Sequence, residues 1–135
     1  MKLATESERA PWEEMLRPAQ RRFFNDICGD LADQLPWHGG IRLTKDDYRH
    51  MLAGTVMGWR TMPGISRDGE PRGWIMLGGS SLDLTKDQCA DAITLALYMG
   101  DHPEEQGLPS RQVRWGYSVL RGLGYSDDDI ARLAA

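Results

Sequence analysis

The side chains in this sequence that could do catalytic chemistry are histidines near carboxylates and serines after a pair of glycines. His50 follows Asp47 by three residues and His38 lies nearby, but no His-x₃-His or Cys-x₂-Cys spacing accompanies them. Such a set is too sparse for a typical metal site. Ser80 and Ser81 lack the Gly-x-Ser-x-Gly elbow of a serine nucleophile. We therefore expect no enzyme activity, no metal and no cofactor. A hydrolase using Ser80, or a metal on His38 and His50, remains an alternative.

Cations and aromatic rings in the first half of the chain favour a different chemistry. Binding to single-stranded nucleic acid needs cations for the phosphates and flat rings on which bases stack. Trp37 and His38 lie in a glycine loop between two basic clusters and could form such a platform. The structural alternative is that Arg22 pairs with Asp26 one helical turn away and that Trp37 fills the core. The two basic clusters are Arg17, Arg21 and Arg22, and Arg42, Lys45 and Arg49.

The length and charge of the chain limit the function classes. With 135 residues and a mass of 15.2 kDa, the chain fits one domain. Its formal net charge of −4 excludes a uniformly basic nucleic-acid binder, but it leaves room for a local basic surface. Residues 16–72 hold nine basic and seven acidic side chains, whereas residues 73–110 hold one lysine and six acidic ones. We expect positive potential in the first half and an acidic surface in the third quarter.

The cysteines and the apolar runs indicate the compartment. Cys28 and Cys89 both fall within apolar helical stripes, as expected of buried thiols in a reducing environment. No apolar run approaches the roughly 20 residues of a membrane helix. The first 15 residues also lack the apolar core of a signal peptide. We expect a soluble protein of the cytoplasm, without a membrane partner.

The best-defined predicted element is a helix that opens near Pro18 and ends before Pro36, where proline stops helical hydrogen bonding. Projection at helical spacing places Gln20 in the middle of the apolar face. Arg22, Asp26 and Asp33 fall on the opposite face. The apolar stripe comprises Phe23, Phe24, Ile27, Cys28, Leu31 and Leu35.

Two further helices and a hairpin are predicted downstream. Thr44 and Asp47 form a capping-box-like pair that starts a second helix. Residues 74–77 read as a short strand that pairs with residues 60–62. A third helix begins at Thr85 and is expected to stop at Gly100.

The C-terminal quarter is predicted to extend this body. Residues 101–110 read as an acidic loop, and the tail reads as two short helices broken at residues 122–125, with Ser126 capping the second. A helix-turn-helix is not expected, because no recognition helix follows the second tail helix. The expected fold is α+β: a mostly helical single domain with a small β-hairpin and a helical C-terminal extension.

One run of residues resembles a known family. Gln20-Arg21-Arg22, then Cys28-Gly29-Asp30, then Trp37-His38-Gly39, at this ungapped spacing, resembles the NinB (Orf) recombination family of lambda-like phages. The likeness continues more loosely to residue 108, through Ile75-Met76-Leu77-Gly78 and Ser80-Ser81. It divides the chain into an N-terminal arm (1–15), a NinB-like domain (16–108) and a C-terminal helical hairpin (109–135).

The resemblance implies a dimeric phage protein that binds single-stranded DNA in the host cytoplasm. The family helps to load a recombinase onto strands coated by single-strand-binding protein, which it contacts. By position, Gln20, Arg22, Trp37, His38, Gly39, Gly78 and Ser80 match its motifs. Gln20 would then line a dimer groove. The residues expected to contact DNA are Gln20, Arg21, Arg22, Trp37, His38, Arg42, Lys45 and Arg49, and Trp37 or Phe23 would stack on bases. The alternative is a protein-interaction module that uses residues 101–106 and the C-terminal helices to bind a host factor without nucleic acid.

Overall fold

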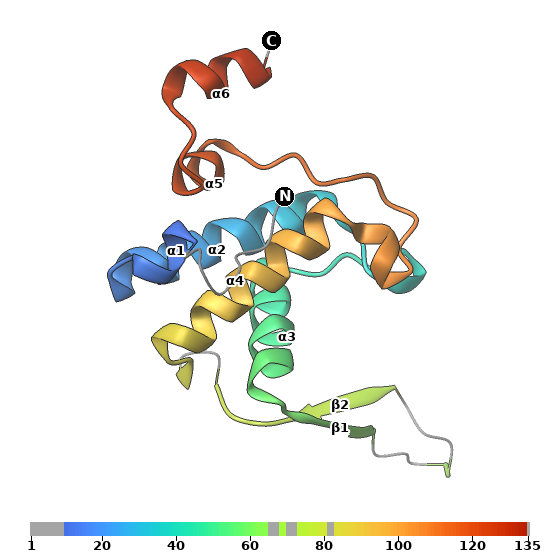
Figure 1. Ribbon diagram of the computed structural model, residues 1–135. Helices are drawn as coiled ribbons and strands as arrows, with labels where there is room; N and C mark the ends of the chain where they lie inside the picture. The colour runs from blue at the N-terminus through green and yellow to red at the C-terminus, as the bar shows by residue number, and fades with distance from the viewer. Residues whose placement is uncertain (1–9, 65–67, 70–72, 81–82, 135) are drawn as a thin grey trace.

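Three packed helices form the body of the molecule in the computed structural model, which describes residues 10–64, 68–69, 73–80 and 83–134 (Figure 1). Helices α2 (Arg17–Gln34) and α4 (Lys86–Asp101) lie side by side, and α3 (Lys45–Met57) packs across both. The hairpin of β1 (Arg60–Pro63) and β2 (Trp74–Leu77) projects from one end. The short elements are α1 (Pro11–Glu14), the 3-10 helices η1 (His38–Gly40) and η3 (Pro103–Gln106), α5 (Tyr117–Gly122) and α6 (Asp127–Ala134). This arrangement confirms the expected mostly helical α+β fold with a helical C-terminal extension.

Helix α2 is the central element, and its two faces are those that the sequence predicted. Pro18 lies in its first turn, where a missing N–H does no harm, and Pro36 follows its end. Arg22, Asp26 and Asp33 are exposed on the outer face. The buried face comprises Gln20, Phe23, Phe24, Ile27, Cys28 and Leu31.

Reciprocal capping boxes start α3 and α4. Thr44 Oγ1 accepts the backbone N–H of Asp47 at 3.1 Å, while the Asp47 carboxylate accepts the N–H of Thr44 at 2.9 Å. Thr85 and Gln88 repeat the exchange at the start of α4. Each box satisfies two N–H groups that the first helical turn leaves without partners. The predicted starts at Thr44 and Thr85 are therefore confirmed.

The core lies where α2, α3 and α4 meet. The Tyr48 hydroxyl of α3 donates a hydrogen bond to the Leu35 carbonyl and is fully buried. Cys28 and Cys89 are buried free thiols, as the sequence predicted. Burial raises the pKa of Cys28 to about 12 and that of Cys89 to about 11, which keeps both as unreactive thiols. Among the described residues, no helix combines the length and the apolarity that crossing a bilayer requires.

The two strands pair antiparallel, in the predicted combination. Arg60 is opposite Leu77, and Met62 is opposite Ile75. Because side chains alternate along a strand, these four residues share one face of the ribbon, and all four are exposed. Met76 belongs to the other face and reaches back to Gly54 in α3, where a Cβ would meet its sulfur at 2.3 Å.

The sequence predicted that the third helix stops at Gly100. In the structure this helix, α4, continues to Asp101. The reason is packing: the Trp115 ring lies against the Gly100 backbone, and its Nε1–H donates to Asp101 Oδ1 at 3.0 Å. Here glycine makes room for an indole instead of ending the helix. The acidic segment after it contains η3, where Glu104 and Glu105 are exposed.

Residues 113–116 tie the C-terminal helices to the body. The Val113 N–H donates to the Gly100 carbonyl at 2.8 Å, and the Gly116 N–H donates to Asp30 Oδ2 at 2.7 Å. The Gln34 amide exchanges two hydrogen bonds with the backbone of Arg114. The tail then forms two short helices, as predicted.

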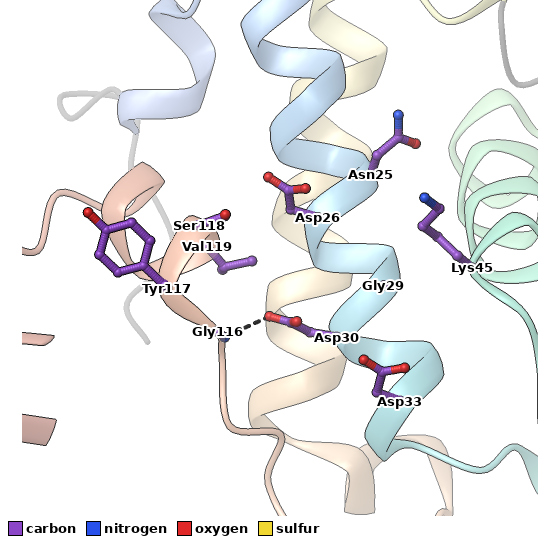
Figure 2. A pocket seen from close by; sticks show the side chains of 10 residues that line it. All are labelled: Asn25, Asp26, Gly29, Asp30, Asp33, Lys45, Gly116, Tyr117, Ser118 and Val119. Carbon is purple, nitrogen blue, oxygen red and sulfur yellow. Dashed lines mark hydrogen bonds between the residues drawn. The ribbon is translucent and has the colours of Figure 1, made fainter. Parts of the chain in front are cut away.

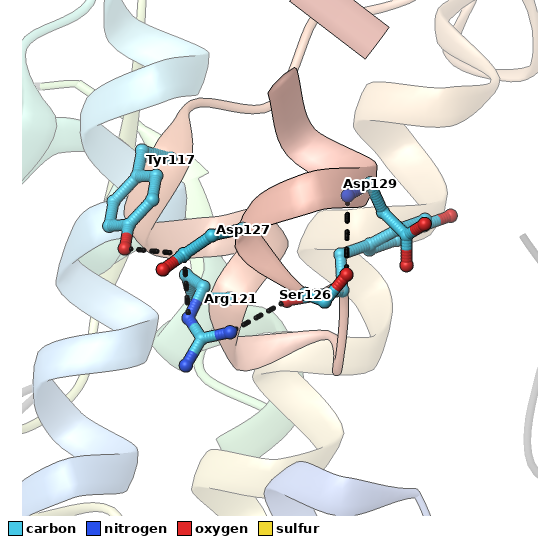
Figure 3. Close-up of polar contacts among 6 residues, drawn as sticks. Tyr117, Arg121, Ser126, Asp127 and Asp129 are labelled. Atoms are coloured by element: carbon cyan, nitrogen blue, oxygen red, sulfur yellow. Dashed lines mark hydrogen bonds and ion pairs between the residues drawn. The ribbon is translucent and has the colours of Figure 1, made fainter. Parts of the chain in front are cut away.

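Polar contacts hold the two tail helices together (Figure 3). Ser126 Oγ caps α6 by accepting the Asp129 N–H at 3.2 Å. The Tyr117 hydroxyl donates to Asp127 at 2.8 Å, and Arg121 lies 3.6 Å from the same carboxylate. The predicted Ser126 cap is confirmed.

We expect Gly100→Ala to destabilise the protein by about 1–3 kcal/mol, the range for overpacking a core. A Cβ at this position would lie 2.4 Å from two carbons of the Trp115 ring, so the indole must move. Urea unfolding followed by circular dichroism measures the change. Gly29→Ala is the matched control, because its Cβ meets only Lys45 Cδ at 3.7 Å. That variant should gain about 0.5–1 kcal/mol from helix propensity. Stabilisation by both variants would contradict the packing of Trp115 on Gly100.

Candidate nucleic-acid interface

A row of cations follows the seam between α2 and the start of α3. Arg49 Nη1 donates to Asn25 Oδ1 at 3.3 Å, and the Lys45 stem lies beside Gly29. Arg42 Nη1 donates to the Asp33 carbonyl at 3.2 Å. Positions 25, 29 and 33 are four residues apart, about one helical turn each. The three cations are therefore spaced by successive turns of α2.

Arg22 extends this row toward the start of α2. It precedes Gly29 by two turns and so shares its face of the helix. Its side chain is exposed, and in the described part of the chain it has no ion-pair partner. The structural alternative, in which Arg22 pairs with Asp26, is therefore wrong, and the Arg22 side chain is exposed to solvent. We call Arg22, Arg49, Lys45 and Arg42 the basic row; along α2 it spans about 16 Å.

The four members of the basic row differ in availability. Arg49 is held by an ion pair with Asp46 at 3.0 Å in addition to its bond with Asn25. Its side chain is 30% exposed, and its buried Nε has no hydrogen-bond partner. Lys45 and Arg42 are exposed. Lys45 and Arg22 are therefore the cations most available to a phosphate.

Carboxylates lie next to the basic row on the side of α2 that faces α5. A hollow of about 310 Å³ lies between α2, Lys45 and the start of α5 (Figure 2). Asp26 and Asp33 on its wall are exposed. Asp30 accepts the Gly116 N–H, and burial raises its pKa above the ordinary value. The local charge is thus mixed, so a polyanion that follows the basic row would meet repulsion from Asp26 and Asp33.

Arg17 and Arg21 lie on a different side of α2. Both donate to the Leu84 carbonyl, at 2.9 and 3.4 Å, just before α4 begins. They therefore belong to the junction of α2 and α4. The structure separates Arg21 from Arg22, its neighbour in the predicted contact set.

Gln20 and Phe23 are core residues. Gln20 is fully buried, and its Nε2 donates to the carbonyls of Trp12 at 3.0 Å and Lys86 at 3.1 Å. The amide thus joins α1, α2 and the start of α4. Phe23 is 4% exposed and packs on Trp12 with ring centroids 6.3 Å apart. The prediction that Phe23 stacks on bases is wrong, because its faces are covered.

Trp37 and His38 lie across α3 from the basic row. Trp37 is half-buried and packs edge-on against Tyr48, with centroids 6.2 Å apart, and against His38 at 5.1 Å. Gly39 and Gly40 have φ of 76° and 73°, which lets the chain fold back so that Trp37 and Ile41 form a β-bridge. Trp37 lines a second hollow, with Leu43, Asp47, His50, Met51 and Met76.

Sequence reasoning missed the residues that organise both places. Asn25 positions Arg49 from the neighbouring helix, and Met51 and Met76 wall the hollow beside Trp37. The four-residue spacing of Lys45 and Arg49 could indicate one face of α3, but not which side of α2 that face meets. Across the described residues, no group of three or more His, Cys, Asp or Glu converges as metal ligands would.

No protein-family model matches the sequence, and no curated protein matches it. Among solved structures, the fold is similar to that of a structural genomics structure named NinB. The TM-score is 0.52, the identity is 19%, and the match covers 88% of this chain and 75% of the other. Low identity with this coverage is a likeness of fold, and it agrees with the resemblance found in residues 16–108. The chain therefore shares the fold of a protein named NinB.

Proposed function

We propose that this protein binds single-stranded DNA through the basic row, as a non-enzymatic accessory of phage recombination. The observation that carries the proposal is the spacing of four cations on successive turns along the α2–α3 seam. The NinB-like fold supports the same assignment. Single-strand binders use such tracks of cations to neutralise the backbone.

The chemistry of binding divides between two places. Arg22 and Lys45, the most available members of the basic row, contact phosphates. Arg42 and Arg49 add positive charge while their side chains are hydrogen-bonded to α2. The half-buried Trp37 ring offers a partly exposed apolar surface before the N-terminus of α3, with His38 against it. Arg21 acts indirectly, by fixing the start of α4.

The finer assignment follows the family resemblance. The protein works as a homodimer in the cytoplasm of an infected host cell and contacts single-strand-binding protein. There it assists the loading of a recombinase on strands coated by single-strand-binding protein. Gln20 supports the site from the core, where it holds α1 and α4 against α2.

The test is the fluorescence anisotropy of a labelled single strand titrated with the protein at low and high salt. We expect binding at micromolar concentrations or tighter, and affinity should fall steeply with added salt as counterions return to the phosphates. Absence of binding at low salt would refute the DNA-binding function.

A protein-interaction role is the second candidate, favoured by a groove between α5 and α6. The groove has a volume of about 720 Å³. It is lined mainly by apolar side chains, and Arg114 adds a cation to the lining. Tyr117 and Leu133 are 59% and 62% exposed. This role predicts a stable complex with a host protein and indifference to nucleic acid, so the same anisotropy titration separates the two candidates.

A further inference from the structure

The hollow beside Trp37 has a lining unlike that of the basic row. It is an open surface hollow of about 360 Å³, lined by the apolar chains of Leu43, Met51 and Met76 together with the Trp37 ring. Asp47 and His50 contribute its polar groups. The His50 ring is held against Trp59, with centroids 4.7 Å apart. The lining therefore suits a small apolar group with one polar edge.

The Asp47 carboxylate decides which polar edge fits. Its Oδ2 accepts the Thr44 N–H in the capping box, and no donor among the described residues reaches Oδ1. A carboxylate accepts hydrogen bonds and repels anions. A phosphate is therefore excluded from the hollow, and an N–H donor is favoured.

We propose that this hollow takes one unstacked nucleobase that carries an exocyclic amino group, such as cytosine. The apolar side chains and the Trp37 ring contact the base, and Asp47 accepts a hydrogen bond from its amino group. Carboxylates read cytosine N4–H₂ in this way, whereas thymine presents the O4 acceptor at the same place. This inference rests on the proposed function and adds a base preference to it.

A single DNA strand can contact both the basic row and the hollow beside Trp37. Arg42 and Lys45 of the basic row alternate in sequence with Leu43 and the capping box of Thr44 and Asp47, at the N-terminus of α3. On α3, Lys45 and Arg49 share one face, while Asp47, His50 and Met51 fall on the far side. A strand that follows the basic row and rounds the start of α3 brings its next base to the hollow.

The experiment compares labelled oligo-deoxycytidylate with oligo-deoxythymidylate of equal length. We expect the wild-type protein to bind the cytosine strand roughly three- to tenfold more tightly, the value of one hydrogen bond. In Asp47→Asn the amide keeps an oxygen for the Thr44 N–H and gains N–H donors that thymine O4 accepts. The preference should disappear or reverse.

Asp87→Asn is the matched control. Asp87 is an exposed carboxylate in the first turn of α4, outside the hollow. It removes the same charge, so it should leave the ratio of the two affinities unchanged. Loss of the preference in this control as well would overturn the inference.

The remaining outcomes distinguish the proposed base site from the proposed DNA-binding function. Equal, salt-sensitive binding of both strands by the wild-type protein would leave the DNA-binding function standing and overturn the base site. If neither strand binds, the proposed function fails. A titration with free 2′-deoxycytidine, which has no phosphate, then decides the hollow. A shift of the Trp37 indole N–H resonance, assigned with Trp37→Phe, supports the base site, and no shift overturns it.

Discussion

The double variant Arg22→Ala, Lys45→Ala should bind single-stranded DNA roughly thirtyfold more weakly at low salt. Each exposed phosphate contact contributes on the order of 1 kcal/mol, and the two are far enough apart to act independently. The slope of log affinity against log salt should fall in magnitude by about 1.4, since each lost phosphate contact on a single strand removes about 0.7. Anisotropy titrations at several salt concentrations measure both quantities.

The control for this variant removes the same two positive charges at positions outside the basic row. Arg60 in β1 and Arg132 in α6 are exposed and lie outside the basic row. Their double alanine variant should leave the salt slope close to that of the wild type. Asp26→Asn should instead raise the affinity for single-stranded DNA, because it removes a carboxylate one helical turn from Arg22. If the Arg60 and Arg132 variant lowers the slope as much as the row variant, binding follows net charge, and the basic row is not the site.

Local signals in the sequence predicted the elements well. The Thr44–Asp47 capping box and the Ser126 cap depend on residues three apart, so their partners are visible in the chain itself. The strand pairing of residues 60–62 with 74–77 followed from apolar residues between turns. The end of α4 was misplaced because Gly100 makes room for Trp115, a residue 15 positions further on. Helix propensity predicts an end at a glycine, but the packing of the distant Trp115 indole on Gly100 changes where α4 ends.

The candidate site was predictable in residue type and only partly in geometry. Arg22, Arg42, Lys45 and Arg49 share a seam because α2 and α3 pack at one register, which no spacing within either helix specifies. The same packing sends Trp37 to the other side of α3, so the aromatic platform and the cations are neighbours around a helix end and not members of one surface. Asn25 shows the limit most clearly: only the structure reveals that its side chain is the one that receives Arg49.

Gln20→Ala should lower the free energy of unfolding by about 2–4 kcal/mol, the largest stability effect that we expect. The variant leaves the carbonyls of Trp12 and Lys86 without their donor and opens a cavity where the amide was. The bond to the Trp12 carbonyl is buried, so water does not replace the lost donor there, and the effect exceeds that of an average hydrogen bond. Urea unfolding followed by circular dichroism gives the change.

Gln34→Ala is a matched control on the same helix. Gln34 also makes two amide hydrogen bonds to backbone, with the N–H and carbonyl of Arg114, but its side chain is exposed. Water replaces those bonds, so the expected change is below about 1 kcal/mol.

The Gln20→Ala variant also tests whether Gln20 takes part in DNA binding. Where Gln20→Ala remains folded, it should bind single-stranded DNA like the wild type, because the basic row is intact. A stable Gln20→Ala protein with lost DNA affinity would place the Gln20 amide on the binding surface and contradict its burial between α1, α2 and α4.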